Sequence, residues 1–373
     1  MHWKGSRTQL GRFAWIGLLW IASIPAAALD LCDFRTPRTD LTNLFLTAHY
    51  TYLDIPDTSA VDVSSGHVSF TFSHIHDEPD RALTLGSTNE LSFDHLKLDR
   101  VLGDAHLTFR FYVASDAPVY AFGEVRADYG SALGRSGLEL RFGSGYGRLT
   151  DVTPLARAVR IQDALLDALV LSSELSDDTV QDIARWIARE AELAGIGELV
   201  SRIETAIETD AGITLNARSL LDIAEVIRST DISQHCGWTT QLGLGYELLR
   251  RFGNSRQLLL TLSTDFARPF RLDSQVEAHA DISRPLVAAA ASALSASVRF
   301  NRRLSDSTRW VTEYTLQRLQ EIDQDPSIGE TFEIQLLFDL GRIDLTVSGS
   351  LSRGTGMSGW VESLSLAARV DLL

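Results

Sequence analysis

Two histidines separated by one residue are the first candidates for chemistry in this sequence. His74 and His76 precede Asp77 and Glu78, and imidazole and carboxylate groups are ligands of divalent metals such as zinc. No second cluster with ligand spacing occurs along the chain. His74 also falls in the same alternating series as three apolar residues, Val68, Phe70 and Phe72. We therefore expect no metal site.

Other histidines are candidate bases for a hydrolase, which needs a histidine beside a serine and an acidic residue. His49, His106 and His279, the last close to Asp281, lie in segments with an extended pattern. Serines are so frequent that any pairing with these histidines is unremarkable. We expect no catalytic residues and no cofactor, and we keep a hydrolase as the third functional hypothesis.

Two groups of alternate glycines resemble phosphate-binding loops only loosely. Gly143, Gly145 and Gly147 form one group, and Gly243 and Gly245 form the other. Neither group has the spacing of a dinucleotide-binding or Walker loop, and both fall within predicted strands. Close packing of aromatic side chains along a sheet explains these glycines better.

The elements that would position these residues follow a secretory signal. Lys4, Arg7 and Arg12 precede the apolar run 13–24, and small residues end at Ala28, an order typical of a signal peptide over residues 1–28. The mature chain then has 31 basic and 49 acidic residues, a net charge of -18. This charge disfavours nucleic-acid binding, and no mature segment is apolar enough for a spanning helix.

Alternation with a period of two dominates the mature chain outside one central block. Between residues 332 and 340 the even positions are apolar and most odd positions are polar, which predicts a strand with one apolar face. Fourteen segments have this character: 42–53, 66–76, 88–98, 104–114, 118–129, 136–148, 237–250, 256–267, 273–284, 293–303, 308–320, 332–340, 343–352 and 360–372.

Strands of this length favour a membrane barrel over a soluble sandwich, because tilted membrane strands need roughly ten residues. Trp238, Trp310 and Trp360 stand near strand starts, where an interfacial girdle would lie. In lipid, an open sheet would leave unpaired edges, so the sheet must close. We predict a mainly β fold, a closed antiparallel transmembrane barrel of about 14 strands, within a range of 12 to 16.

The central block, residues 151–231, has a helical pattern and a net charge of -9. Thr153 is the predicted cap of a first helix that begins at Pro154, and Ser176 is the predicted start of a second. A third helix is expected over 197–209, stopped by Gly212, and Asn216 is expected to cap a fourth. The predicted inward stripes are Leu155, Val159, Leu165, Leu166 and Leu169 in the first helix and Leu220, Leu221, Ala224 and Ile227 in the fourth.

This pattern divides the chain into four parts. The signal peptide occupies residues 1–28, the first part of the barrel with about six strands 29–150, the helical insertion 151–231, and the remaining eight strands 232–373. Because both chain ends of such barrels are periplasmic, an insertion after six strands is also periplasmic. Cys32 and Cys236 would then lie on the same side, where an oxidising compartment permits a disulfide. Their distance decides whether the bond forms, so this pairing stays open here.

The mature chain resembles bacterial outer-membrane β-barrel proteins of the porin-like kind over its strands. The passage from Gly145 to Leu155 also resembles the strand-to-helix junction of exported barrels with a helical insertion. The chain departs from such barrels at its end, because Leu372 and Leu373 stand where a terminal Phe is usual. The resemblance implies the outer membrane of a Gram-negative bacterium as the location, with membrane lipid and the barrel-assembly machinery as partners.

The polar alternation of the predicted strands carries 14 acidic residues and 5 arginines. A low-dielectric wall focuses such a field, so a water-filled interior would concentrate cations. The residues expected to line the channel are Glu124, Arg126, Asp128, Glu139, Arg141, Glu247, Asp265, Glu277, Arg299, Glu313, Glu333, Asp344 and Arg369.

We therefore predict a non-enzymatic, passive diffusion channel with mild cation preference. The alternative is a blocked barrel that acts as an envelope scaffold, whose helical insertion at 151–231 docks a periplasmic protein.

Overall fold

The computed structural model describes residues 30–371 except 36–37, 54–62, 96, 115–116, 132–134, 229–232, 250–256, 287–291, 306, 321–324, 341–342 and 358. The predicted signal peptide and the terminal Leu372 and Leu373 lie outside these described residues. No helix in the described ranges combines the length and apolarity needed to cross a bilayer.

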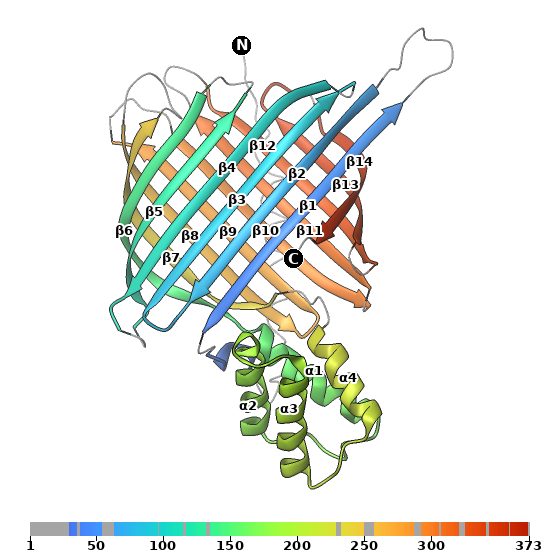
Figure 1. The fold of residues 1–373 in the computed structure, drawn as a ribbon. Coiled ribbons are helices and arrows are strands. Elements are labelled where there is room, and N and C mark those ends of the chain that lie inside the picture. The colour runs from blue at the N-terminus through green and yellow to red at the C-terminus, as the bar shows by residue number, and fades with distance from the viewer. Residues whose placement is uncertain are drawn as a thin grey trace, which may run out of the picture.

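Fourteen antiparallel strands form one closed barrel, as predicted (Figure 1). Six strands precede the helices: β1 Thr39–Leu53, β2 Val63–Asp77, β3 Arg81–Asp94, β4 Lys97–Tyr112, β5 Val119–Gly130 and β6 Arg135–Asp151. Eight follow them: β7 His235–Leu249, β8 Leu258–Arg271, β9 Ser274–Pro285, β10 Ser292–Ser305, β11 Thr308–Gln320, β12 Ser327–Asp339, β13 Ile343–Gly354 and β14 Val361–Asp371.

The barrel closes where β1 meets β14. This seam pairs Phe45 with Asp371 and continues to Ala48 opposite Ala368. All other neighbours are consecutive in the chain, so the sheet is a simple up-and-down meander. The third strand begins earlier than the predicted residue 88, because the Glu78 N–H donates to the Arg81 carbonyl at 2.8 Å and closes a tight turn.

The apolar face of the sheet points outward. In β8, Leu258, Leu260 and Leu262 are exposed, while the residues that alternate with them, Leu259, Thr261 and Ser263, are buried. Leu366 in β14 is likewise 57 % exposed. A soluble barrel would place these leucines in its core, so the observed orientation is that of a wall surrounded by an apolar medium.

Four helices lie between β6 and β7, namely α1 Thr153–Asp167, α2 Asp177–Ile187, α3 Ile196–Ala211 and α4 Ala217–Arg228. Ser176 caps α2 through its side chain, Asn216 accepts from two N–H groups at the start of α4, and Gly212 ends α3 in a left-handed conformation. The predicted cap at Thr153 is wrong. Val152 occupies that position, and the Thr153 hydroxyl instead accepts from the N–H of Gln234 at 2.8 Å.

The helices share a hydrophobic core whose largest buried members are Leu155, Ile161, Leu165, Ile183, Leu199, Ile203, Ile207 and Ile223. Two residues predicted to point inward do not. Leu169 is 89 % exposed, because α1 has ended and its φ of 56° turns the side chain out. Leu221 is 70 % exposed, because α4 buries the stripe of Ser219, Ile223 and Ile227 instead.

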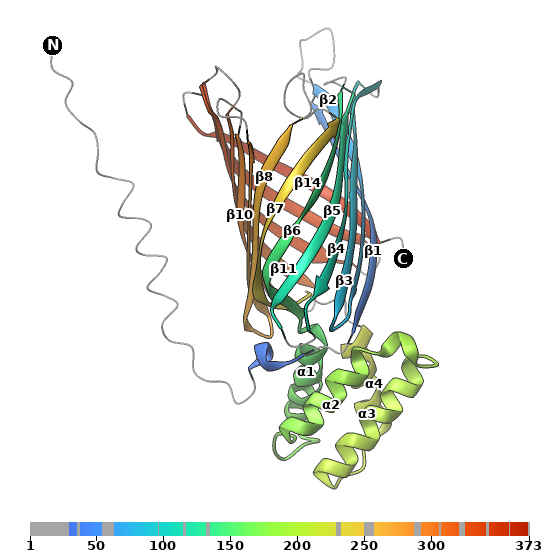
Figure 2. The same ribbon diagram turned by 90° about the vertical axis from the view of Figure 1, so that its left-hand side faces the viewer.

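The helices lie beyond one end of the barrel, hereafter the helical end (Figures 1 and 2). The opposite end is called the loop end. A short 3-10 helix, Leu31–Asp33, lies beside them, and a disulfide joins Cys32 to Cys236 at the start of β7 with a Cα separation of 5.4 Å. Hydrogen bonds also link the two parts, since Arg160 of α1 donates to the Leu272 carbonyl at 2.9 Å in the β8–β9 turn.

Candidate functional site

The thirteen residues predicted to line a channel all lie on the inward face of the barrel. Side chains directly opposite each other on neighbouring strands share one face, and the register pairs Glu124 with Arg141, Arg126 with Glu139, Glu139 with Glu247, Glu277 with Arg299, Arg299 with Glu313, Glu313 with Glu333, and Asp344 with Arg369. Asp128 and Asp265 fall on the same alternation in β5 and β8. Eight of these residues fall into two groups with different chemistry.

The first group is a tightly bonded ion network on β5, β6 and β9. Arg141, which is 3 % exposed, donates to both carboxylate oxygens of Glu139 at 2.7 and 3.1 Å and to Asp281 at 3.1 Å. Arg126 donates to Glu124. A buried charge is stable only when it is paired and hydrogen-bonded, and these charges meet that condition within the chain. This network is therefore structural.

Aromatic side chains cover the interior glycines next to this network. A Cβ on Gly145 would lie 2.2 Å from the Tyr120 ring, and a Cβ on Gly143 would lie 2.2 Å from the Leu242 carbonyl and 2.9 Å from Phe122. Tyr120 is fully buried and shares a hydrogen bond with Thr239. These rings occupy the space beside Gly143, Gly145 and Gly243 on β6 and β7, as the glycine pattern suggested.

The second group surrounds a cavity of about 330 Å³ on β8 to β11. We call it the acidic pocket and define it by its inward polar residues, namely Asp265, Glu277, His279, Ser297, Arg299 and Glu313. Here His279 is bonded to Asp265 at 2.6 Å, but two other ion pairs are loose, since Arg299 Nε lies 3.9 Å from Glu313 and His235 Nδ1 lies 4.0 Å from Glu277. These groups are partly exposed to the interior, unlike the Arg141 network.

The hydrolase pattern is not assembled in the described part of the chain. His279 Nδ1 hydrogen-bonds to Asp265 at 2.6 Å rather than to Asp281. Ser297 stands opposite His279 on β10, yet no hydrogen bond joins the two among the described residues. Sequence spacing favoured Asp281 because it is two residues away, but strand pairing brings Asp265 directly opposite.

His74 and His76 point to the outer surface near the helical end, on the face that carries Val68, Phe70 and Phe72. His76 contacts Asp40 at 3.1 Å and Glu78 at 3.3 Å through opposite ring nitrogens. In the β2–β3 turn, the hydrogen bond from Arg81 and the nearby His76 hold the pKa of Glu78 below its usual value. The described residues contain no group of three or more potential ligands placed to hold a metal.

The wall formed by β13 and β14 carries paired hydroxyl groups on its inward face. Ser348 and Ser365 share a hydrogen bond of 2.6 Å, and Ser350 and Ser363 share one of 2.7 Å. Asp344 lies at the helical end of this wall, where it stands 3.7 Å from Arg309. The interior therefore has charged groups on β5 to β11, while β13 and β14 combine paired hydroxyl groups with the charged pair of Asp344 and Arg369.

Arg148 makes several contacts at the helical end of the barrel. Its guanidinium stacks 4.4 Å above the Tyr112 ring and donates to Asp77 at 2.7 Å and to the Glu78 and Pro79 carbonyls. It thus joins β6 to the β2–β3 turn. Sequence reasoning missed this residue, because Gly147 with φ of 98° interrupts the regular alternation just before it.

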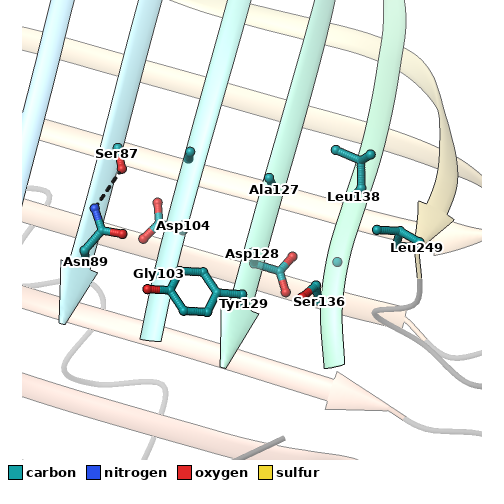
Figure 3. Close-up of a pocket in the computed structure, with 12 residues that line it drawn as sticks. Ser87, Asn89, Gly103, Asp104, Ala127, Asp128, Tyr129, Ser136, Leu138 and Leu249 are labelled. Atoms are coloured by element: carbon teal, nitrogen blue, oxygen red, sulfur yellow. Dashed lines mark hydrogen bonds between the residues drawn. The ribbon is translucent and has the colours of Figure 1, made fainter. Parts of the chain in front are cut away.

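A second cavity, of about 460 Å³, lies between β3 and β7 near the loop end (Figure 3). Most of its lining residues, including Ser87, Asn89, Ala105 and Tyr129, fall on the outward alternation. Asn89 donates to Ser87 at 3.1 Å within it. This cavity belongs to the outer wall and not to the interior.

Comparisons with known proteins return barrels of low similarity. No family model matches the chain, and no curated protein matches it. Among solved structures, the outer membrane channel DcaP of Acinetobacter baumannii has a TM-score of 0.36 at 8% identity, covering 91% of this chain and 99% of its own.

A BenF-like porin from Pseudomonas fluorescens Pf-5 has a TM-score of 0.34 at 8% identity, and the match covers 91% of this chain and 100% of the porin. The COG4313 outer membrane channel from Pseudomonas putida F1 has a TM-score of 0.31 at 10% identity, and the match covers 92% of this chain and 98% of the channel. Similarity this low carries no argument about what this chain does.

Proposed function

We propose that the protein is an outer-membrane diffusion channel with a mild preference for cations. The observation that carries the proposal is the division of the wall into an apolar outer face and a charged inner face. An apolar exterior suits acyl chains, and a charged interior suits water and ions. Export by the predicted signal peptide and the resemblance to porin-like barrels agree with a Gram-negative outer membrane.

The proposed cation preference rests on the excess of carboxylates over arginines in the acidic pocket, where Asp265, Glu277 and Glu313 accompany Arg299. Arg126 and Arg141 are bonded to carboxylates of the tight network. Glu313 and Glu333 stand opposite each other on β11 and β12, and Arg299 Nε lies 3.9 Å from Glu313. Rings or rows of carboxylates in a pore attract cations and repel anions.

Planar bilayer recording tests this function. Purified, folded protein should give stepwise currents, and a potassium chloride gradient should give a reversal potential of the sign expected for potassium permeation. Heat-modifiable migration on a gel verifies that the inserted protein is folded. Folded protein that gives no steps would contradict the channel, and a reversal potential of opposite sign would contradict the cation preference.

A docking role for the helices is the second candidate, favoured by the exposure of Leu169 and Leu221. Large apolar side chains on a surface mark interaction sites when they gather. Deleting residues 151–231 tests this role. Unchanged conductance with loss of a crosslinked periplasmic partner would support docking, whereas a sharp rise in conductance would identify the helices as a plug.

A further inference from the structure

We propose that the acidic pocket binds a small solute of net positive charge that carries two cationic groups, ammonium or guanidinium, together with one carboxylate, as basic amino acids do. This inference rests on the proposed channel function and names the solute class of that channel. It follows from the contrast between the two charge groups inside the barrel. One group is bonded internally, whereas in the other Arg299 Nε stands 3.9 Å from Glu313 and has no hydrogen-bond partner among the described residues.

Arg299 offers a binding group for a carboxylate. It lies between Glu277 of β9 and Glu313 of β11, but it hydrogen-bonds to neither. Its Nε is buried and has no hydrogen-bond partner among the described residues. Guanidinium groups bind carboxylates through two parallel hydrogen bonds. Arg141 has such a bidentate partner in Glu139, whereas Arg299 has none.

Carboxylates around Arg299 offer binding groups for a cation. Glu313 and Glu333 are direct cross-strand neighbours on the inward face, and like charges directly opposite one another are destabilising. A cation between them relieves that repulsion. Glu277 keeps one oxygen available, because Gln275 donates to the other at 2.6 Å.

The shape and composition of the pocket favour an organic solute over a bare metal ion. The described residues contain no group of three potential ligands placed to hold a metal. The cavity volume of about 330 Å³ is at the small end of the range for small-molecule sites. The bond from His279 to Asp265 fixes one wall. Ser297 on the neighbouring strand supplies a hydroxyl for a further hydrogen bond.

Single-channel recording with L-arginine tests the proposal. In potassium chloride, adding L-arginine should produce concentration-dependent interruptions of the current, and L-glutamate at equal ionic strength should not. Arg299→Gln removes the carboxylate-binding group and Glu313→Gln removes a cation-binding group. Each change should weaken the L-arginine effect by about 10-fold, as expected for a lost charged hydrogen bond.

Glu90→Gln is the matched control, because it makes the same change on the inward face of β3, where Ser92 donates to the carboxylate at 3.1 Å. It should leave the L-arginine effect within about twofold, since Glu90 stands on β3, apart from the strands that line the pocket, and salt screens charges that lie far apart. Heat-modifiable migration verifies that each variant folds. A loss of effect as large as that of Glu313→Gln would show that general interior charge, not the pocket, holds L-arginine.

Two further outcomes separate this inference from the channel itself. Stepwise potassium currents that L-arginine does not alter would overturn the solute assignment and leave the channel standing. Folded protein without any current would overturn the channel, and titration calorimetry of the detergent-folded protein with L-arginine would then test the pocket directly. Absence of binding heat in that titration would overturn the pocket as well.

Discussion

At the scale of single residues, the interior glycines determine where aromatic side chains pack inside the barrel. Tyr120 and Phe122 of β5 occupy the space where side chains of β6 and β7 would otherwise stand. Any side chain at Gly143 would meet the backbone of β7 as well as a ring. Because backbone cannot move aside as a flexible side chain does, this position has no tolerance for a Cβ.

We expect Gly143→Ala to destabilise the folded barrel by about 1–3 kcal/mol, the usual range for overpacking. Urea unfolding of the protein in detergent or vesicles measures this. Gly349→Ala is the control, since a Cβ there would meet no atom within 4 Å. Equal midpoints for the two variants would contradict the packing described for Tyr120 and Phe122.

A second residue-scale prediction concerns Asp163 in α1. Burial, with Asp167 and Glu174 nearby, raises the pKa of Asp163 above its usual 3.8. A carboxyl whose pKa is higher when folded favours folding only while protonated, so its ionisation destabilises the helices as pH rises through that value. Asp163→Asn should therefore stabilise the helices at neutral pH and have little effect near or below pH 3.8, as measured by hydrogen exchange.

Asp210→Asn is the control variant, and it should change the stability of the helices in the opposite direction. The Ser176 N–H and hydroxyl donate to the Asp210 carboxylate at 2.8 and 2.9 Å and lower its pKa. A lowered pKa stabilises the fold above the unfolded value and loses that effect as pH falls. This variant should weaken the helices at neutral pH, with the difference shrinking in acid. The same sign for both variants would contradict the assignment.

Residue-level chemistry was only partly predictable from the sequence. Alternation located Arg141 and Arg299 on the inward face, because a period of two needs no long-range information. It could not tell that Arg141 is tightly bonded and Arg299 loosely paired. That difference depends on which side chains of other strands lie close to each arginine, as Asp281 of β9 does to Arg141. The cross-strand register decides which side chains these are.

At the scale of elements, strand number and helix caps were predictable and helix faces less so. Ser176, Gly212 and Asn216 act locally, so their roles follow from a few neighbouring residues. Thr153 failed as a cap because Gln234, far along the chain, engages its hydroxyl. The prediction that Leu221 points inward was wrong, because the helices that pack against α4 decide which of two adjacent stripes of residues is buried.

The disulfide makes an element-scale prediction. Leu31, Phe34 and Cys236 pack against the helical core, so the bond holds the N-terminal segment on that core. Replacing both Cys32 and Cys236 by Ser should destabilise this contact by roughly 2–5 kcal/mol, the usual effect of losing a native disulfide. Faster hydrogen exchange confined to residues 30–35 and the helices would measure it. Unaltered exchange there would contradict a stabilising role.

At the scale of the whole molecule, closure of the sheet predicts resistance to detergent. A closed barrel has no unpaired edge for detergent to open. Membrane-fraction protein should therefore migrate differently on a gel before and after boiling. Identical migration in both states would contradict a closed barrel, and the Cys32→Ser, Cys236→Ser double variant should keep the shift because the strands pair without the disulfide.

The covalent link between Cys32 and Cys236 has a consequence for cleavage in the envelope. It joins two points 204 residues apart, so a protease that cuts the backbone once anywhere between them produces two fragments that stay attached. A nicked chain would run as one species without reductant and as two with it. The acidic helices could thus be cut in place while their pieces remain tethered to the barrel.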